Sequence, residues 1–354
     1  MRKLLVLFLS VATLTLGWVG WTPPARAAQK TLNLFIWSEY IDPKIPQEFE
    51  KATGIKVNIT TYESNEAMMA KLQAGGDSEY DVIVPSSYVI KPLEHLHLVQ
   101  KLNHSLIPNL KNLKKMFRNS PNDPGNVYSV AYQWGTTGLL YRKDKVKNFQ
   151  NTWGLLFNEK MNQGPFYLID DERSMMGIAL RYLGYPFNST DPAQLKKAAD
   201  LLVKVKKYPD CLVFRGGVGA KNDVVAGTAV AAIVYNGDAA KAINKNKNIP
   251  MAYTIPKEGG EIWYDNMMIT DKAPHPKEAN EFINFILEPK IGAQLSDYNE
   301  YATPNEASMP YIDKGDHDDP AIYPSEAVLK TLRTTRDMGK KMKLLDAAWT
   351  RAKS

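Results

Sequence analysis

Hydrophobic and polar positions follow two alternating patterns from residue 31 onward. Short apolar or alternating runs predict strands, and apolar positions three and four residues apart predict helices. Polar residues before the helical stretches serve as N-caps, and glycines after them serve as stops. In the first part of the chain the pattern predicts a strand near 31–37, a helix near 43–53 ending at Gly54, a half-buried strand over 55–62, a helix from Ser64 or Asn65 to Gly75, a buried strand over 80–85 and a helix capped by Ser86 and Ser87.

The same alternation continues in the rest of the chain. Strands that alternate with helices are typical of a mostly parallel sheet covered by helices, so the sequence predicts the α/β class. In such sheets, ligands bind beyond the carboxyl ends of the strands. The further predicted elements are a strand over 164–170, helices over 173–183 and 192–207, a buried strand over 228–235, a helix from about 238, a strand over 261–270, a helix over 276–287 with Phe282, Phe285 and Ile286 inward, and a mostly helical tail from Ser325.

The first 27 residues differ from the rest. Arg2 and Lys3 precede a long apolar stretch, and the segment 25–27, Ala-Arg-Ala, matches the small-residue rule for signal peptidase. We expect residues 1–27 to be a signal peptide that is removed on export. An uncleaved membrane anchor is the alternative, although the apolar run is at the short limit for spanning a bilayer.

Composition and charge argue against several classes of function. The chain has 354 residues, enough for two domains, and a formal net charge of +6. Removal of residues 1–27 takes away three basic residues and no acid, which leaves a charge of +3. A charge this small and evenly spread does not favour nucleic-acid binding. Cys211 is the only cysteine, so the chain forms no internal disulfide.

Aromatic and acidic residues gather where the predicted strands end. Lysine and arginine are few there, although helix N-termini at this edge would hold an anion unaided. Ring faces and carboxylates together attract an ammonium group, so the pattern predicts a site for an organic cation. The residues are Trp37, Ser38, Glu39 and Tyr40 after the first strand, Ser86, Ser87 and Tyr88 after the third, then Asp170, Asp171, Tyr235, Asp238, Trp263, Asp265 and Tyr301.

Each of these residues also has a purely structural interpretation. Trp37 and Tyr40 fit an ordinary core, because aromatic residues dominate most cores. One of Asp170 and Asp171 is expected to cap the helix that follows, and Asp238 fits a cap of the next helix. The recurrence of the pairing at successive strand ends favours binding more than any single residue does.

Several motifs resemble one known family. They are WSEYI, TGIKVNITTYESNEAMMAKL, YDVIVPSSY, WGTTGLLY, YNGDA, PKEGGEIWYDNM, INFILEP and YATPNEAS, and they occur in the family's order. On these motifs the chain resembles the periplasmic spermidine/putrescine-binding proteins of ABC transporters, which have the type II solute-binding protein fold. The resemblance covers nearly the whole chain after residue 27, and TYESNEAM and PKEGGEIWYDN are its most specific parts.

The resemblance implies two α/β lobes, each a mostly parallel sheet flanked by helices, joined by two crossing segments. It implies a monomeric, exported periplasmic receptor, not an enzyme and without cofactor or metal. Such a receptor clasps putrescine or spermidine between its lobes and delivers it to a membrane permease. The implied crossing segments lie near 131–138 and 255–262. The implied N-terminal lobe comprises residues 30–136 and 263–309. The implied C-terminal lobe comprises residues 137–262 and 310–354.

The resemblance also implies residue roles and shows two departures. Spermidine-type members usually have Trp where this chain has Tyr235, and Glu three residues after Asp171, where this chain has Ser174. Asp238 matches a carboxylate of putrescine-type members, and we hypothesise that it replaces the missing glutamate. The implied roles are rings around the methylene chain for Trp37, Tyr40, Tyr235, Trp263 and Tyr301, hydrogen bonds to an amine for Ser38, Ser86 and Tyr88, and ammonium binding for Asp171 and Asp265.

Other functions fit the sequence less well. The histidines lie in no zinc or nucleophile motif, the glycine-rich stretch 216–222 matches no phosphate-loop pattern, and the acidic stretch 313–320 lacks EF-hand spacing. Among binding functions, the alternative is a receptor for an amino acid such as 4-aminobutyrate, which needs a donor for its carboxylate. Arg173 is the nearest candidate, but we expect it to pair with a neighbouring acid.

Overall fold

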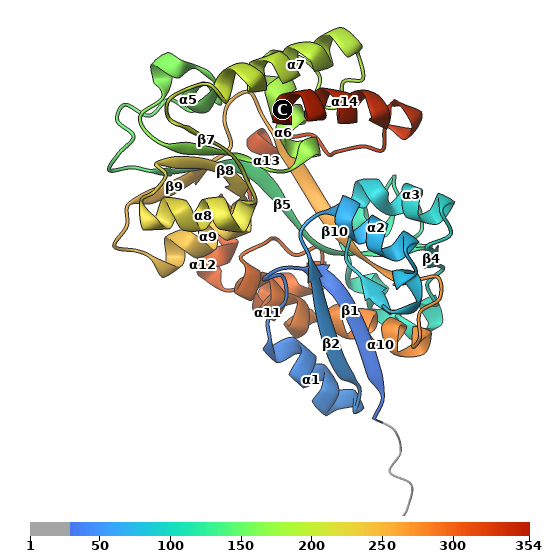
Figure 1. Cartoon of the computed structure of the whole chain (residues 1–354). Coiled ribbons are helices and arrows are strands. Elements are labelled where there is room, and N and C mark those ends of the chain that lie inside the picture. The colour runs from blue at the N-terminus through green and yellow to red at the C-terminus, as the bar shows by residue number, and fades with distance from the viewer. Residues whose placement is uncertain (1–28) are drawn as a thin grey trace, which may run out of the picture.

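The computed structural model describes residues 29–354, and the predicted signal peptide lies outside these residues. Two groups of helices are separated by long central strands (Figure 1). The strands are β1 (Thr31–Trp37), β2 (Lys56–Tyr62), β3 (Val82–Ile83), β4 (Val99–Gln100), β5 (Ser129–Arg142), β6 (Phe166–Ile169), β7 (Cys211–Arg215), β8 (Ala231–Tyr235), β9 (Met251–Thr254) and β10 (Glu261–Thr270). The α-helices are α1 (Lys44–Thr53), α2 (Asn65–Gln73), α3 (Ile90–His95), α4 (Lys115–Arg118), α5 (Gly154–Phe157), α6 (Glu172–Tyr182), α7 (Pro192–Val205), α8 (Gly217–Ala226), α9 (Asn236–Lys245), α10 (Pro276–Ile286), α11 (Pro289–Asn299), α12 (Lys314–His317), α13 (Glu326–Leu329) and α14 (Met342–Lys353).

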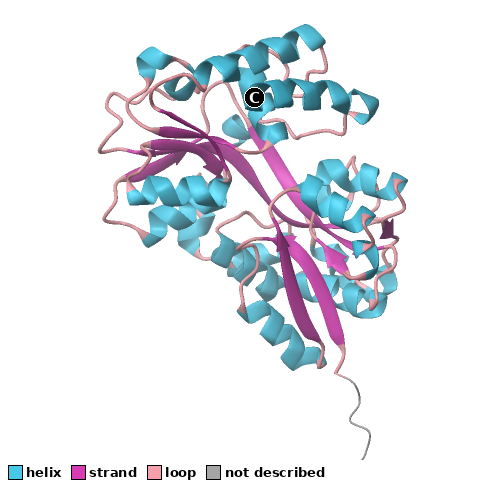
Figure 2. Ribbon diagram, viewed as in Figure 1, coloured by secondary structure: helices cyan, strands magenta, loops and turns pink. Residues whose placement is uncertain are grey.

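The strands form one mixed sheet in the order β2-β1-β3-β10-β5-β8-β6-β7, with β4 beside β10 and β9 beside β5. At one end β1 pairs in parallel with β2 and β3, and at the other β6 pairs in parallel with β7 and β8. The two long strands in the middle, β5 and β10, run antiparallel to each other and to their neighbours. Helices cover both parallel ends (Figure 2), so the α/β prediction is confirmed.

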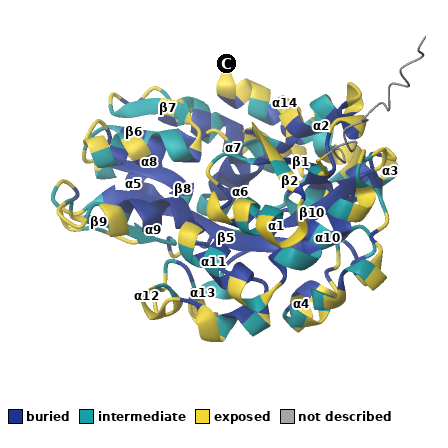
Figure 3. Ribbon diagram, turned by 90° about the horizontal axis from the view of Figure 1, so that it is seen from below, coloured by how far each residue is buried: buried dark blue, intermediate teal, exposed yellow. Residues whose placement is uncertain are grey.

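The strands β5 and β10 connect the two ends of the molecule. The first part of β5 pairs with β10, and its last part pairs with β8 and β9. Every residue of β5 except Arg142 is buried, and β5 is dark blue along most of its length in Figure 3, while β10 is buried except at Ile262, Trp263 and Tyr264. The predicted crossing near 131–138 lies within β5, while that near 255–262 ends at the start of β10. A residue on either strand can therefore face both lobes.

Each end of the molecule has its own hydrophobic core. In the first, Phe49 packs edge-on against Phe282, and in the second, Trp153 and Phe166 are fully buried. Of the three residues predicted to face inward, Phe282 and Ile286 are buried, and Phe285 is half-buried against the same core. The tail contributes to both cores, because Ile322 joins the first and the helix α14 joins the second. The lobe boundaries given above stay a prediction.

Most predicted elements lie within two or three residues of their observed ends, but two predictions about them are wrong and several elements were not predicted. The strand β2 is mostly exposed rather than half-buried, because it is the outer strand of the sheet and only Tyr62 is buried. Ser86 and Ser87 make no side-chain cap, and a 3₁₀ turn precedes α3 instead. The pattern also missed β7 and α8, and it did not predict the central strand β5, the strands β4 and β9 or the helices α4, α5, α11 and α12.

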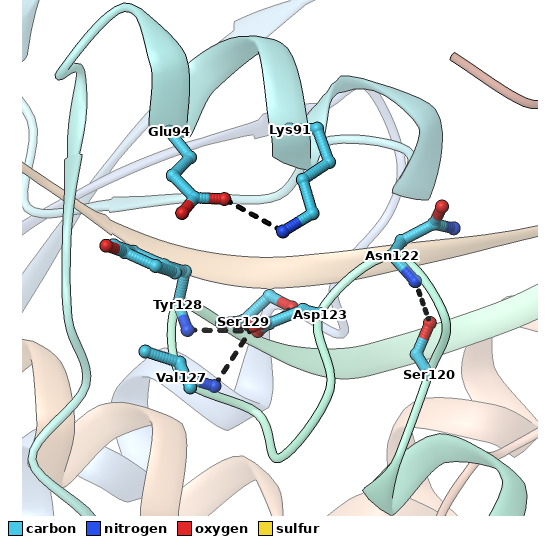
Figure 4. A network of polar contacts seen from close by, with 8 residues as sticks. All are labelled: Lys91, Glu94, Ser120, Asn122, Asp123, Val127, Tyr128 and Ser129. Carbon is cyan, nitrogen blue, oxygen red and sulfur yellow. Dashed lines mark hydrogen bonds and ion pairs between the residues drawn. The ribbon is translucent and has the colours of Figure 1, made fainter.

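A carboxylate fixes the chain just before it enters β5. Asp123 is almost fully buried and accepts hydrogen bonds from the backbone N–H groups of Val127, Tyr128 and Ser129, at 3.1, 2.9 and 2.7 Å (Figure 4). The Ser129 hydroxyl donates to the same carboxylate at 2.7 Å. Four donors on one anion offset the cost of its burial, so the start of the central strand is fixed in place.

Candidate ligand-binding cleft

A cleft of about 610 Å³ lies where the ends of β1 and β3 face the ends of β6 and β8. All eleven residues predicted from the sequence line it, although they come from segments up to 264 residues apart in the chain, from 37 to 301. The structure therefore brings the predicted residues together in one place. They are Trp37, Ser38, Tyr40, Ser86, Tyr88, Asp171, Tyr235, Asp238, Trp263, Asp265 and Tyr301.

Four aromatic rings form a continuous row in the cleft. Trp263 stands edge-to-face with Tyr235 on one side and Tyr301 on the other, with ring centroids 5.7 and 5.1 Å apart. Tyr301 in turn meets Tyr40 at 5.6 Å. Trp37 lies outside this row, because its indole Nε1 donates to the Val84 carbonyl at 2.8 Å and fixes the ring against the first lobe. All four rings line the cleft, and ring faces can attract a cation.

Two glycines make room for these rings. A Cβ atom added at Gly237 would lie 2.5 Å from the Tyr301 ring, and one at Gly135 would lie 2.6 Å from the Trp263 ring. Both distances are far below ordinary van der Waals contact. The glycine of YNGDA and the first glycine of WGTTG are therefore required by close packing, since neither has a positive φ angle.

Asp265 is a buried carboxylate on β10 with one hydroxyl donor. The Ser86 hydroxyl donates to it at 2.7 Å, across the bridge that joins these two residues. Burial raises the pKa of Asp265 to about 7, and the Ser86 hydrogen bond opposes this shift. No lysine, arginine or histidine of the described residues forms an ion pair with Asp265. An entering cation would stabilise its charged form.

Asp171 both caps a helix and faces the cleft. Its Oδ1 accepts from the Ser174 backbone N–H at 2.8 Å, as expected for one of the paired aspartates at the start of α6. Its other oxygen accepts from the Tyr235 hydroxyl at 3.2 Å. Asp170 instead forms an ion pair with Lys353 at 2.6 Å. The two adjacent aspartates therefore have different partners, and only Asp171 keeps an oxygen directed at the ring row.

Asp238 is buried in the first turn of α9, but it does not cap the helix. The helix begins at Asn236 with Tyr235 as its N-cap residue, and Asp238 accepts no backbone hydrogen bond among the described residues, so the expected capping role is wrong. Burial raises the pKa of Asp238, while the positive charges of Lys221 and Lys241 oppose the shift. Both lysines are themselves buried. The charge of Asp238 is thus partly compensated within the protein.

The three predicted amine-binding hydroxyls have different partners. Ser38 donates to Glu63, Ser86 donates to Asp265, and the Tyr88 hydroxyl accepts from Asn65 Nδ2 at 2.9 Å. Tyr88 also donates to Glu66 at 3.4 Å, which is a long contact. These hydroxyls already have acceptors or donors in the structure, so a ligand would share or exchange those bonds.

The expectation that Arg173 pairs with an acid is wrong. Its guanidinium donates to the Arg336 carbonyl and lies 3.1 Å from the Met342 sulfur. It also lies over the Tyr88 ring, 5.1 Å from the centroid, and so contacts the opposite lobe. The reason is spatial, because the helix α6 turns this side chain toward the C-terminal segment rather than toward a carboxylate.

Several cleft residues were missed by the sequence analysis. They include Glu261 and Thr335, which are both buried, Trp349, and the glycine-rich turn 216–219 at the start of α8. The signal for Glu261 was present, because residues 261, 263 and 265 alternate on one face of a strand. The glycine-rich stretch was tested only against phosphate-loop patterns, so its position beside the cleft was missed.

Two further observations bear on what the cleft can hold. The indole nitrogen of Trp263 is buried without a hydrogen-bond partner among residues 29–354, so its donor remains available to an acceptor that enters. Within the same residues, no group of three or more metal-ligating side chains could hold a metal ion. A search for a helix both long and apolar enough to traverse a bilayer finds none in this part of the chain.

The fold and the cleft are those of a receptor for solutes, and comparison with known proteins gives the family. The model for bacterial extracellular solute-binding proteins matches residues 44–323, and the chain belongs to this family. Its relatives include a putrescine-binding periplasmic protein of Pseudomonas aeruginosa, 36% identical over 349 residues, covering 93% of this chain and 94% of the relative. A spermidine/putrescine-binding periplasmic protein of Escherichia coli is 34% identical over 310 residues, covering 87% of each.

A solved structure extends the likeness to the fold. A putative spermidine/putrescine ABC transporter from Listeria monocytogenes superposes with a TM-score of 0.85 at 35% identity, covering 92% of this chain and 99% of that one. The predicted two-lobed type II periplasmic-binding-protein fold is confirmed by this match.

Proposed function

We propose that this protein captures linear polyamines, such as putrescine or spermidine, in the cleft between its lobes and delivers them to the permease of an ABC transporter. The observation that carries the proposal is the pairing of a ring row with Asp171 and Asp265, two carboxylates that form no ion pair with a basic side chain of residues 29–354. A chain of methylene groups between ammonium groups matches this pairing.

The expected affinity follows from ordinary magnitudes. A ring face attracts an ammonium by about 0.5–2 kcal/mol, and a hydrogen bond to a charged group contributes about 1.5–3 kcal/mol. Several of each, after the cost of association, reach about −8 kcal/mol, which is micromolar binding. The same residues offer little to an anion, since their carboxylates would repel it.

Residue roles follow the same logic. Trp263, Tyr235, Tyr301 and Tyr40 are proposed to enclose the methylene chain, with Trp37 at the border of the cleft. Ser38, Ser86 and Tyr88 are proposed to bond an amine, and Asp171 and Asp265 to hold ammonium groups. Asp238 lines the same cleft beside its two lysines.

The printed names of the relatives support the ligand class and the transport role. Relatives over 30% identical are named as binding proteins for putrescine or spermidine, and each match covers most of both chains. Their periplasmic location supports export of this chain as well. The amino-acid alternative needs a free donor for a carboxylate, and Arg173 is already engaged by a carbonyl and by Tyr88.

Calorimetry of the protein without residues 1–27 tests the proposal. We expect putrescine, spermidine or spermine to bind in the micromolar range or tighter, and 4-aminobutyrate to bind at least a hundredfold more weakly than the best amine. Binding of 4-aminobutyrate with no heat from any of the three amines would show that the proposed ligand class is wrong.

The proposed lobes, 30–136 with 263–309 and 137–262 with 310–354, imply closure around the ligand by a hinge in the crossing segments. X-ray scattering should therefore give a smaller radius of gyration with saturating polyamine than without it. Superimposable scattering curves in the two conditions would count against hinge closure.

A further inference from the structure

The carboxylate of Glu261 is held by hydroxyl groups from three separate segments. Thr137 on β5 donates to it at 2.9 Å, Ser174 on α6 at 2.5 Å, and Thr335 in the C-terminal segment at 2.6 Å. The side chain is almost completely buried and lines the cleft. No lysine, arginine or histidine of residues 29–354 pairs with it.

Glu261 stands in line with two residues already placed in the site. On β10, residues 261, 263 and 265 point to the same face, because side chains alternate along a strand. All three line the cleft, and their neighbours Ile262 and Tyr264 do not. Four residues of a strand span about 13 Å, so β10 presents an acid, a ring and a second acid in a row.

The position of Glu261 also answers the question raised by Ser174. The resemblance implied a glutamate at position 174, where this chain has a serine too short to carry a charge. The Ser174 hydroxyl instead donates to Glu261, so the carboxylate at this end of the cleft belongs to β10 and not to α6. Asp238, the other candidate, forms no ion pair among the described residues either, but the positive charges of Lys221 and Lys241 oppose the rise of its pKa, which they do not do for Glu261.

We propose that Glu261 is the ammonium-binding carboxylate that takes the place of the missing glutamate at 174. In this arrangement Glu261, with Asp171 nearby, holds one end of a linear amine, Asp265 holds another ammonium, and the methylene chain lies along Trp263. This inference rests on the proposed function, and it assigns a specificity-determining residue to that site.

The electrostatics of the cleft agree with this role. Burial and the charge of Asp171 raise the pKa of Glu261, while its hydroxyl donors oppose the shift. Glu261 in turn contributes to the raised pKa of Asp265. The three hydroxyls donate to both carboxylate oxygens, and in a glutamine one of these positions would become an NH2 donor, so one hydroxyl would have to accept instead. A carboxylate among other carboxylates is costly unless a cation shares the cleft.

The variant Glu261→Gln tests the inference, because it removes the charge and keeps the shape. We expect putrescine affinity, measured by calorimetry at pH 8, to fall at least tenfold. The matched control is Glu300→Gln, which makes the same change in a buried glutamate that does not line the cleft, and we expect a change of less than threefold. If wild type binds no polyamine, the proposed function fails; if wild type binds and Glu261→Gln stays within threefold, this inference alone fails.

Two further measurements separate binding from a structural role. N-acetylputrescine carries one ammonium instead of two, so the wild-type preference for putrescine over it should shrink at least fivefold in Glu261→Gln. A merely structural glutamate would weaken both ligands equally, and that result would overturn the inference. The double variant Ser174→Glu with Glu261→Gln returns a carboxylate from α6. It should recover at least part of the lost affinity, and a folded double variant without putrescine binding would also contradict the inference. The double variant carries the test if Glu261→Gln alone does not fold.

Discussion

Asp265 and Asp238 are both buried acids that line one cleft, but their surroundings differ. Asp265 accepts a hydrogen bond from the Ser86 hydroxyl and has no basic partner among the described residues, and burial raises its pKa to about 7 although hydrogen bonds from Ser86 and Tyr40 oppose the shift. Asp238 is equally buried, but Lys221 and Lys241 oppose the rise of its pKa. Burial alone therefore does not mark a binding residue. The acid that lacks a partner within the protein is the one whose charge an entering cation can best stabilise.

The largest expected effect comes from Asp265→Asn. Loss of the carboxylate should weaken polyamine binding by about 2–5 kcal/mol, the range for breaking a desolvated charge pair, or roughly 30- to 5,000-fold. Calorimetry with putrescine measures the loss. The melting temperature of the ligand-free variant should not fall, since an unpaired buried charge is removed. Affinity within twofold of wild type would reduce Asp265 to a structural residue.

A smaller loss is expected from Gly237→Ala, which pushes on the ring row without touching a charge. The added methyl group would lie 2.5 Å from the Tyr301 ring, so the ring must move. Overpacking of this kind costs about 1–3 kcal/mol, and we expect both a lower melting temperature and at least fivefold weaker putrescine binding. The control is Gly216→Ala in the same cleft, where an added Cβ atom meets nothing within 4 Å. Equal behaviour of the two variants would mean that the ring row does not depend on close packing at Gly237.

The pH dependence of binding tests the raised pKa of Asp265. The pKa of Asp265 is about 7 in the ligand-free folded protein, above the ordinary value of about 4 in the unfolded chain. The contribution of this group to the free energy of unfolding is therefore lost as the pH rises from about 4 through 7. Polyamine binding needs the charged carboxylate, so affinity should rise over the upper part of that window. We expect binding at pH 6 to be about tenfold weaker than at pH 8. Asp265→Asn should show a flatter profile, and a wild-type affinity that is constant from pH 6 to 8 would contradict the assignment.

The smallest effect is expected from Asp238→Ser. Asp238 and Glu261 are competing candidates for the glutamate missing at position 174, and the sequence-based hypothesis for Asp238 predicts a loss of at least tenfold in this variant. If Glu261 is the replacement, Asp238→Ser should change putrescine affinity by less than about threefold. Since Asp238 does not cap α9, the melting temperature should move little. A tenfold loss of affinity at unchanged melting temperature would instead favour Asp238 over Glu261 as the replacement.

Much of the fold could be predicted from local chemistry. Gly54 ends α1 in the left-handed conformation, with φ of 74°, and Asp171 caps α6, as expected for one of the paired aspartates. These features depend on residues three or four positions apart, so the sequence contains them directly. The exposure of β2 could not be predicted, because its alternating pattern is the same whether the strand lies inside the sheet or at its edge.

In the cleft too, some features could be predicted from the sequence and others could not. Residues at strand ends, such as Trp37 and Tyr235, were predicted because parallel strands in one sheet point their carboxyl ends to a common edge. The charge environment was not predicted. Arg173 was expected to find an acid and instead donates to a carbonyl 163 residues away. The pairing of basic groups with acids depends on how segments far apart in the chain pack together. The local sequence pattern does not show this packing.

By itself, the sequence determined the alternation of strands and helices, the caps, and the rings and acids at the strand ends, because these arise from short-range periodicity and from the geometry of a strand. Only the tertiary structure decided which acids have partners. Ser174 and Glu261 are 87 residues apart and meet through a hydroxyl, while Asp238 lies beside Lys221 and Lys241. A charge is stabilised or left uncompensated by what lies within a few ångströms of it, and that distance is set when the helices α6, α8 and α9 pack against β10 and its neighbours.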